Sequence, residues 1–201
     1  MDLTKVKKNL EANGFTVSVF DTAAQAAEYL DKNIDGATVG MGGSVTLGDM
    51  GVYEKLIKHN TVFWHWRVSR DTDRTELFRS AQTADVYLSS VNGLAETGEL
   101  INIDGTGNRV SAIQYGHKKV WLVAGKNKIA PDYESALYRA RNVAAPLNAK
   151  RLGAATPCAA KGDRCYNCDS PARICRGLSV LWKKPGGCDY EIVLINEDIG
   201  Y

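Results

Sequence analysis

The sequence contains 201 residues, of which 44% are hydrophobic and 24% are charged, with a net charge of +2. These values are typical of a globular protein with one large domain, and they give no electrostatic argument for binding nucleic acid or a membrane surface. No apolar run approaches the ~18 residues of a membrane span, and residues 1–8 lack the apolar segment of a signal peptide. We therefore expect a cytoplasmic protein without nucleic-acid or membrane partners.

Helical and extended patterns alternate along the first half of the chain. Apolar residues recur at helical spacing in residues 3–13, whereas residues 15–20 alternate between apolar and polar side chains, as a half-buried strand does. Thr22 and Gln25 have the spacing of a capping box, which predicts a helix over 22–33. The elements expected next are strand 37–39, helix 46–59, strand 61–66 and helix 75–84.

The second half of the chain continues this alternation and ends in a segment of different composition. The expected elements are strands 85–90, 99–103 and 119–124, helix 131–147 and strand 191–196. Strands that alternate with helices predict an α/β fold with a mainly parallel sheet and helices on both faces. We expect a single domain over residues 1–201, in which residues 153–188 form a small Cys-rich appendage.

A glycine-rich turn over residues 40–46 follows the short strand at 37–39 and opens a helical pattern. Such a turn brings backbone N–H groups together at a helix N-terminus, which suits a phosphate or a carboxylate. The candidate ligand-binding residues here are Gly42, Gly43, Ser44 and Thr46. The alternative is a tight turn in which glycine is simply the residue that fits.

Two further segments place polar and cationic residues after glycines. Asn108 and Arg109 follow a second glycine-rich turn, and Lys128 follows Gly125 at the end of an expected strand. Guanidinium and ammonium groups pair with phosphate or carboxylate. We therefore add Asn108, Arg109 and Lys128 to the candidate ligand site, although lysines of this kind are more often solvated.

Four cysteines, Cys158, Cys165, Cys168 and Cys175, follow the pattern Cys-x6-Cys-x2-Cys-x6-Cys. In a reducing compartment such cysteines favour metal binding or redox chemistry over disulfides. Four thiolates can bind Zn²⁺ tetrahedrally or hold an iron–sulfur cluster such as [4Fe-4S]. The glycine- and charge-rich surroundings cannot easily build a core, so a metal would stabilise the segment. The alternatives are reduced thiols or a redox-active pair, Cys165 and Cys168.

Glu96 lies in a predicted loop between two strands. A carboxylate at a strand end can act as a nucleophile or a general base. The more common case is a solvated loop acid.

Five motifs spread over nearly the whole chain resemble the LUD-domain family, the lactate-utilisation protein C family, in its short stand-alone form. They are Gly42-Gly43-Ser44-x-Thr46, Ala95-Glu96-Thr97-Gly98, Asn102-x-Asp104-Gly105-x-Gly107-Asn108-Arg109, Gly125-x-Asn127-Lys128 and Thr156-Pro157-Cys158. The resemblance implies a fold like that of the sugar-phosphate isomerases and CoA-transferases, with ligands bound over the strand ends. It places Glu96 in the region where CoA-transferase relatives have a catalytic glutamate. It also implies a role in oxidising L-lactate to pyruvate alongside iron–sulfur partner proteins.

This sequence differs in its C-terminal region from the lactate-utilisation members of the family that it resembles. Those members end in a Gly-Pro-Ser-x-Thr-Ala-Asp-like segment, whereas this chain has the four-cysteine segment instead. The sequence thus suggests a stand-alone protein that carries its own metal or redox element.

Three functions remain open from the sequence. The first is a redox-linked protein of organic-acid metabolism that binds a small anionic metabolite and has redox partner proteins. The second is an isomerase- or CoA-transferase-like enzyme that uses Glu96 and a structural zinc, and the third is a non-catalytic ligand-binding module. Such sheets often associate through their helices, which allows a homodimer.

Overall fold

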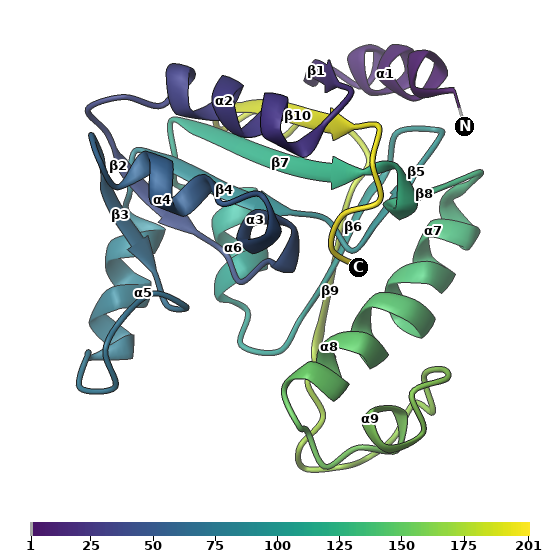
Figure 1. Cartoon of the computed structure of the whole chain (residues 1–201). Helices are drawn as coiled ribbons and strands as arrows, with labels where there is room; N and C mark the ends of the chain where they lie inside the picture. The colour runs from purple at the N-terminus through teal and green to yellow at the C-terminus, as the bar shows by residue number, and fades with distance from the viewer. Residues whose placement is uncertain (1) are drawn as a thin grey trace.

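Six parallel strands form the main sheet of the protein, which a computed structural model describes over residues 2–201 (Figure 1). The strand order is β1-β10-β7-β4-β2-β3, and every neighbouring pair is parallel. The strands are β1 (Thr16–Phe20), β2 (Thr38–Met41), β3 (Thr61–Trp64), β4 (Val86–Ser90), β7 (Lys119–Gly125) and β10 (Asp189–Ile195). The parallel sheet predicted from the sequence is confirmed.

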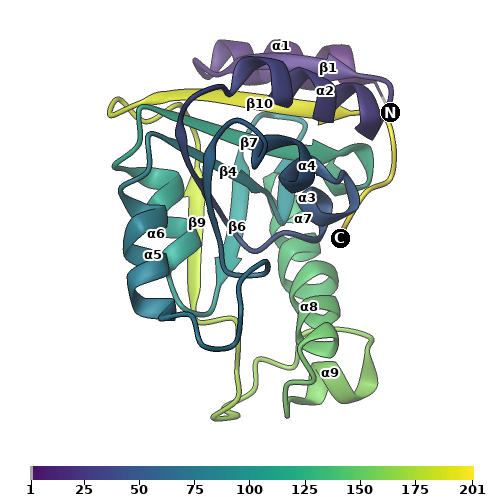
Figure 2. The ribbon, with the colours of Figure 1, turned by 60° about the vertical axis from the view of Figure 1, so that its left-hand side comes forward.

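Helices cover both faces of this sheet, as predicted (Figure 2). One face carries α2 (Ala23–Asn33), α3 (Val45–Asp49) and α4 (Val52–Leu56), whose buried Leu30, Leu47 and Leu56 share a core with Trp121 of β7. The opposite face carries α1 (Leu3–Ala12), α5 (Arg74–Gln82) and α6 (Asn108–Gln114). There Leu10 and Ile113 pack with Leu122, because alternate residues of a strand point to opposite faces.

A second, mixed sheet of four short strands lies beside α1 and α6 and differs from the sequence-based prediction. Its order is β8-β5-β6-β9, with β5 (Gly93–Ala95), β6 (Leu100–Asp104), β8 (Ile129–Ala130) and β9 (Gly177–Leu181). β6 is antiparallel to both β5 and β9, whereas β5 and β8 are parallel. Only β6 was expected, because β5 and β8 are too short to leave a periodic pattern and β9 lies in the segment expected to form the Cys-rich appendage.

A long helical segment packs on the second sheet. It consists of α7 (Tyr133–Arg139), a π-helical turn η2 (Ala140–Ala144) and α8 (Ala145–Arg151), where the sequence predicted one continuous helix. The buried small residues Ala136 and Ala140 contact Ala95 and Ile101 of the sheet. None of the helices in residues 2–201 combines the length and hydrophobicity that a bilayer crossing requires.

Two other expectations change in detail. The helix expected over 46–59 is divided into α3 and α4, because Gly51 has a positive φ of 63° between them. The Cys-rich segment begins with α9 (Pro157–Lys161), continues without regular structure and then enters β9. The segment is therefore joined to the second sheet by a strand rather than being wholly an appendage.

Candidate functional site

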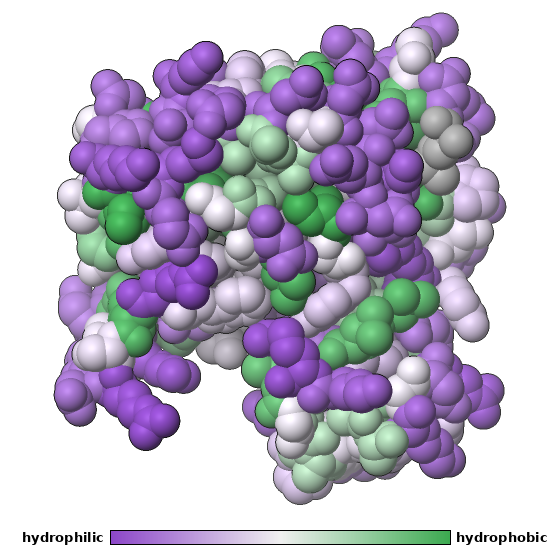
Figure 3. Space-filling view, viewed as in Figure 1, coloured by the Kyte–Doolittle hydropathy of each residue, from purple (hydrophilic) through white to green (hydrophobic). Residues whose placement is uncertain are grey.

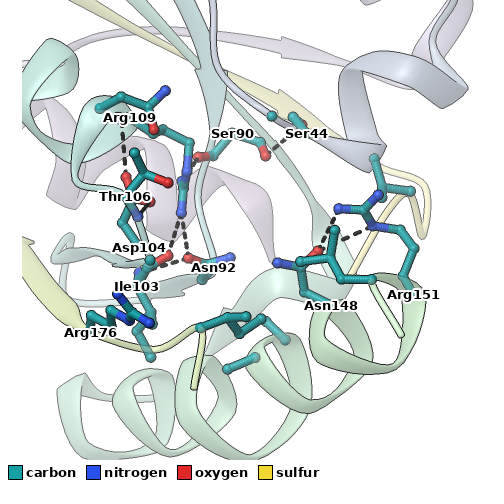
Figure 4. A pocket seen from close by; sticks show the side chains of 18 of the residues that line it. Ser44, Ser90, Asn92, Ile103, Asp104, Thr106, Arg109, Asn148, Arg151 and Arg176 are labelled. Carbon is teal, nitrogen blue, oxygen red and sulfur yellow. Dashed lines mark hydrogen bonds between the residues drawn. The ribbon is translucent and has the colours of Figure 1, made fainter. Parts of the chain in front are cut away.

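A cavity of about 700 Å³ lies at the carboxyl ends of the parallel strands. Ser44 follows β2, His65 follows β3, Ser90 ends β4 and Lys128 follows β7, and all four line the cavity. The opposite wall comes from the turn before α6, from α8 and from the Cys-rich segment, as the close view in Figure 4 shows. Figure 3 shows this side of the molecule hollowed between the parts that carry α5 and α9. Ligands commonly bind at this end of parallel sheets.

The charge of the cavity wall is strongly unbalanced. Among residues 2–201, the wall contains a single acidic side chain, Asp104, and six basic side chains, which are Arg74, Arg109, Lys128, Arg151, Arg173 and Arg176. The positive charge of the wall affects the pKa of the His65 imidazole. Burial lowers this pKa, and the charges of Arg74 and Arg151 lower it further. Burial and the positive potential of these arginines thus both favour the neutral imidazole.

Arg109 is the buried cation on the α6 side of the cavity and is only 9% exposed. Its Nη1 donates to the carbonyl of Ser90 at 3.1 Å and to Asn102 Oδ1 at 2.5 Å. Its Nη2 donates to Asn92 Oδ1 at 2.9 Å and to the carbonyl of Ile103 at 2.7 Å. These four neutral acceptors fix Arg109 in the wall of the cavity, and the acidic side chain whose charge acts on it is Asp104.

Asp104, the acidic side chain of the wall, accepts hydrogen bonds from the backbone at the start of α6. Its Oδ2 accepts from the backbone N–H groups of Arg109 at 2.9 Å and Val110 at 3.1 Å. Burial alone would raise the pKa of Asp104, but the charge of Arg109 and the backbone N–H donors outweigh it and hold that pKa below its ordinary value. The carboxylate therefore organises the start of α6 and stays ionised.

Lys128 is the most deeply buried charged side chain of the wall, at 1% exposure. It follows β7 in the 3₁₀ turn η1 (Lys126–Lys128). Its Nζ donates to Thr46 Oγ1 at 2.7 Å and to the carbonyl of Val91 at 3.1 Å, both neutral acceptors. Burial and the neighbouring charges of Arg139 and Arg109 lower the pKa of Lys128 to about 7.

The glycine-rich turn is shaped by close contacts. A Cβ on Gly42 would lie 2.8 Å from Ser89 Oγ and 3.0 Å from Cδ of Arg109, so only glycine lets β2 approach the buried arginine. Ser44 caps α3, since its Oγ accepts from Leu47 N at 3.2 Å, and its hydroxyl lies 2.7 Å from that of Ser90. Because α3 has only five residues, its N-terminus is a weak source of positive potential, and the side-chain cations dominate.

Most of the ligand-binding residues expected from the sequence are brought together in this cavity. Gly43, Ser44, Asn108, Arg109 and Lys128 line it. The two exceptions sit directly behind the wall: Gly42 lies against Arg109, and Thr46 accepts the hydrogen bond of Lys128.

The structure adds wall residues that the sequence did not single out as ligand-binding. The main ones are Arg74, Ser90, Asn92, Asn148, Arg151 and Tyr201. Ser90 could have been found, because a buried strand that ends in two serines is unusual. Arg74 and Arg151 gave no signal, since exposed arginines on helices are normally solvated.

Glu96 lies apart from this cavity. It occupies the turn between β5 and β6, and its carboxylate forms an ion pair with Lys5 of α1 at 2.7 Å. Its backbone carbonyl accepts from Asn9 Nδ2 at 2.6 Å. Glu96 thus does not share a site with the other candidates, and its catalytic role stays a prediction.

The four candidate metal ligands, Cys158, Cys165, Cys168 and Cys175, line one small pocket next to the cavity. All four are half-buried free thiols. Arg173 holds the loop together, because its Nε donates to the carbonyl of Cys175 at 2.9 Å and its Nη1 to that of Cys168 at 3.0 Å. Within residues 2–201, however, no three His, Cys, Asp or Glu side chains converge as a ready-made metal site.

Comparison with known proteins supports the fold and places the chain in a family. The crystal structure of a DUF162 family protein from Deinococcus radiodurans superposes with a TM-score of 0.54 at 14% identity, and the match covers 96% of each chain. No curated protein matched the sequence. A family model of the LUD domain matches residues 3–195. The chain therefore belongs to the LUD-domain family.

Proposed function

We propose that this protein binds a small anionic metabolite bearing a carboxylate or a phosphate in its cavity and serves the utilisation of lactate or a related organic acid. The observation that carries the proposal is the set of five arginines, with Lys128, facing a single acidic side chain that already accepts hydrogen bonds from the backbone. Positive charges gathered in this way repel one another, and a bound anion would offset that repulsion. The lactate connection rests on membership of the LUD-domain family.

Several polar groups are positioned to contact the anion. Asn92 uses its Oδ1 for Arg109 and for the backbone N–H of Ile103, and its amide nitrogen has no partner among residues 2–201 (Figure 4). Arg74, at the first position of α5, likewise makes no hydrogen bond through its guanidinium to the described chain. These free donors, with the hydroxyl pair of Ser44 and Ser90, suit the oxygens of a carboxylate or phosphate.

Calorimetric titration with inorganic phosphate, pyruvate and lactate tests the proposal. Arg74→Gln removes one free cation from the wall, and Arg79→Gln is the matched control, because Arg79 is on the same helix, does not line the cavity and is 74% exposed. A charge-assisted hydrogen bond contributes about 1.5–3 kcal/mol, so Arg74→Gln should weaken binding by about tenfold or more. Equal affinities in the two variants, or no binding of any of the three anions, would contradict the proposal.

For the four-cysteine pocket we propose a single metal ion, with zinc favoured over an iron–sulfur cluster. The pocket has a volume of about 10 Å³, which is room for one water-sized sphere, whereas a cluster needs more. Zinc binding would draw the four thiolates into a tetrahedron and stabilise a loop that lacks regular structure. A [4Fe-4S] cluster, which would supply electrons to a redox partner protein, is the alternative.

Metal analysis of anaerobically purified protein separates these cases. Cys165→Ser should abolish binding of one zinc ion, whereas Cys188→Ser should not, because Cys188 packs against the core of the main sheet. Iron with acid-labile sulfide would instead favour the cluster. Protein with neither metal, unchanged by Cys165→Ser, would leave the cysteines as thiols and refute the proposed site.

A further inference from the structure

We propose that Lys128 forms a reversible Schiff base with an anionic carbonyl compound, such as a 2-oxo acid or a sugar phosphate, held in the cavity. The inference rests on the proposed anion binding and adds a covalent activity to it. It names the class of ligand more narrowly, because a carbonyl group must accompany the carboxylate or phosphate.

The position of Lys128 is the first argument. Its side chain comes from the carboxyl end of β7, a central strand, and lines the cavity that Ser44, Ser90 and Arg109 also line. At 1% exposure it is shielded from bulk water, unlike the arginines at the rim. Shielding from water favours an imine, because imine formation releases water.

The hydrogen bonds of Lys128 are the second argument. Its Nζ has two neutral acceptors, Thr46 Oγ1 at 2.7 Å and the carbonyl of Val91 at 3.1 Å. A neutral amine can satisfy both acceptors with its two N–H bonds and keep its lone pair free for attack, whereas an ammonium group would bury a third N–H without an acceptor. Burial and the charges of Arg139 and Arg109 also favour the neutral form, and they lower the pKa of Lys128 to about 7. A desolvated lysine beside other cations is the arrangement that activates an amine nucleophile.

The bonding changes balance without an oxidant or a reductant. The lone pair of Nζ attacks the carbonyl carbon, a C–N bond forms, and the carbonyl π electrons move to the oxygen. The two N–H protons pass to that oxygen, which leaves as water, and a C=N double bond remains. Hydrolysis reverses these steps and returns the free lysine and the carbonyl compound.

The cations of the wall fix the ligand for this attack. The anionic group of the ligand would bind toward Arg74 and Arg151, which line the cavity together with Lys128. In a 2-oxo acid the carbonyl carbon is bonded directly to the carboxylate carbon, so holding the carboxylate also positions the carbonyl. A sugar phosphate separates the two groups by several bonds and would use more of the cavity's length.

Reductive trapping tests the inference. The whole chain is incubated with pyruvate, ribose 5-phosphate or lactate in the presence of sodium cyanoborohydride, and the modified lysines are identified by peptide mass spectrometry. Pyruvate and ribose 5-phosphate distinguish the two sources of the carbonyl, and lactate is an anion without one. We expect one adduct per chain at Lys128 with a carbonyl compound and none with lactate.

Variants and pH give the controls. Lys128→Met and Lys128→Arg should abolish the adduct, and the arginine variant keeps a cationic donor if the methionine variant is unstable. Lys126→Met, two residues away and outside the cavity wall, should leave it unchanged. Because the neutral fraction of a group rises about tenfold per pH unit below its pKa, labelling of Lys128 should rise up to pH ~7 and then level off.

The outcomes separate this inference from the binding proposal. Binding of pyruvate or phosphate without an adduct at Lys128, or an adduct spread over exposed lysines and retained in Lys128→Met, would refute the Schiff base alone. Absence of binding by phosphate, pyruvate and lactate in the calorimetric titration would refute the anion site and, with it, the Schiff base.

Discussion

The Nζ of Lys128 and the hydroxyl of Thr46 are joined by a buried hydrogen bond of 2.7 Å. This bond links the turn after β7 to α3, which follows β2, so two strand ends are held together at the floor of the cavity. Thr46 also lies against the C-terminal residues, because a Cβ on Gly200 would come within 2.3 Å of its hydroxyl oxygen. The contact explains why the motifs around Thr46 and Lys128, distant in sequence, belong to one site.

Thr46→Val tests this link. The substitution keeps the shape of the side chain but removes the acceptor, so a buried N–H of Lys128 loses its partner. We expect a loss of about 1–3 kcal/mol in the free energy of unfolding, measured by urea denaturation. Thr61→Val, at an exposed position in β3, is the control and should be nearly neutral. A Thr46→Val variant as stable as the wild type would show that the bond is dispensable.

The stability of the protein should depend on pH through Lys128. Its pKa is about 7 in the folded state and near the ordinary 10.5 when unfolded, so the unfolded chain binds more protons between these values. The free energy of unfolding should therefore rise in that window by at most about 1.4 kcal/mol per pH unit. Below pH ~7 both states bind the proton, so the cost of burying the charged Lys128 no longer changes with pH. The charged groups that act on it are Arg109, Arg139 and Asp49.

Comparison with Lys128→Met isolates this contribution from other titrating groups. The difference in unfolding free energy between wild type and variant, measured at pH 7, 8 and 9, should shift in favour of the wild type as the pH rises. Parallel pH profiles for the two proteins would mean that Lys128 titrates normally.

Gly42→Ala should disturb the cavity wall from behind. The new methyl group would lie 2.8 Å from Ser89 Oγ and 3.0 Å from Arg109 Cγ and Cδ, so the buried arginine has to shift. Such overpacking costs about 1–3 kcal/mol of stability, and displacement of Arg109 should also weaken phosphate binding. Gly186→Ala is the matched control, since its Cβ would meet open space. Unchanged stability and binding in Gly42→Ala would contradict the described packing.

Glu96→Gln separates the cavity from the glutamate that the family resemblance suggests as catalytic. Because Glu96 pairs with the exposed Lys5 outside the cavity, we expect the variant to bind phosphate and pyruvate as the wild type does and to unfold at nearly the same urea concentration. Loss of turnover with retained binding, once a reaction is known, would support the catalytic role. Weakened anion binding in Glu96→Gln would contradict the placement of the site.

The sequence predicted the parts of the fold that leave a periodic pattern. The main strands were recognisable by alternation or by apolar runs, and the carboxyl ends of two of them pointed to Ser44 and Lys128. Apart from β6, the second sheet was missed, because β5 and β8 have only three and two residues and β9 pairs with β6 from within the Cys-rich segment. The π-helical turn after Arg139 is likewise set by packing on the second sheet rather than by local propensity.

The site was predictable in part for the same reason. Residues that follow strands and glycines were identified, whereas Arg74 and Arg151 come from helices and reach the cavity only through the tertiary fold. Arg173 and Arg176 lie in the Cys-rich segment, whose cysteine pattern predicted a metal site rather than a wall of the cavity. Glu96 shows the opposite case, a motif residue that the fold places outside the cavity, where it pairs with Lys5.

Chemical-shift mapping by NMR tests the central claim, the anion site, most directly. Spectra of ¹⁵N-labelled protein are recorded during titration with inorganic phosphate and with pyruvate at physiological ionic strength, where weak surface pairing is screened. The account predicts saturable shifts concentrated at the backbone N–H groups of Gly43, Ser44, Asn92 and Lys128. Shifts that do not saturate, or that scatter over exposed lysines and arginines outside the cavity, would contradict it.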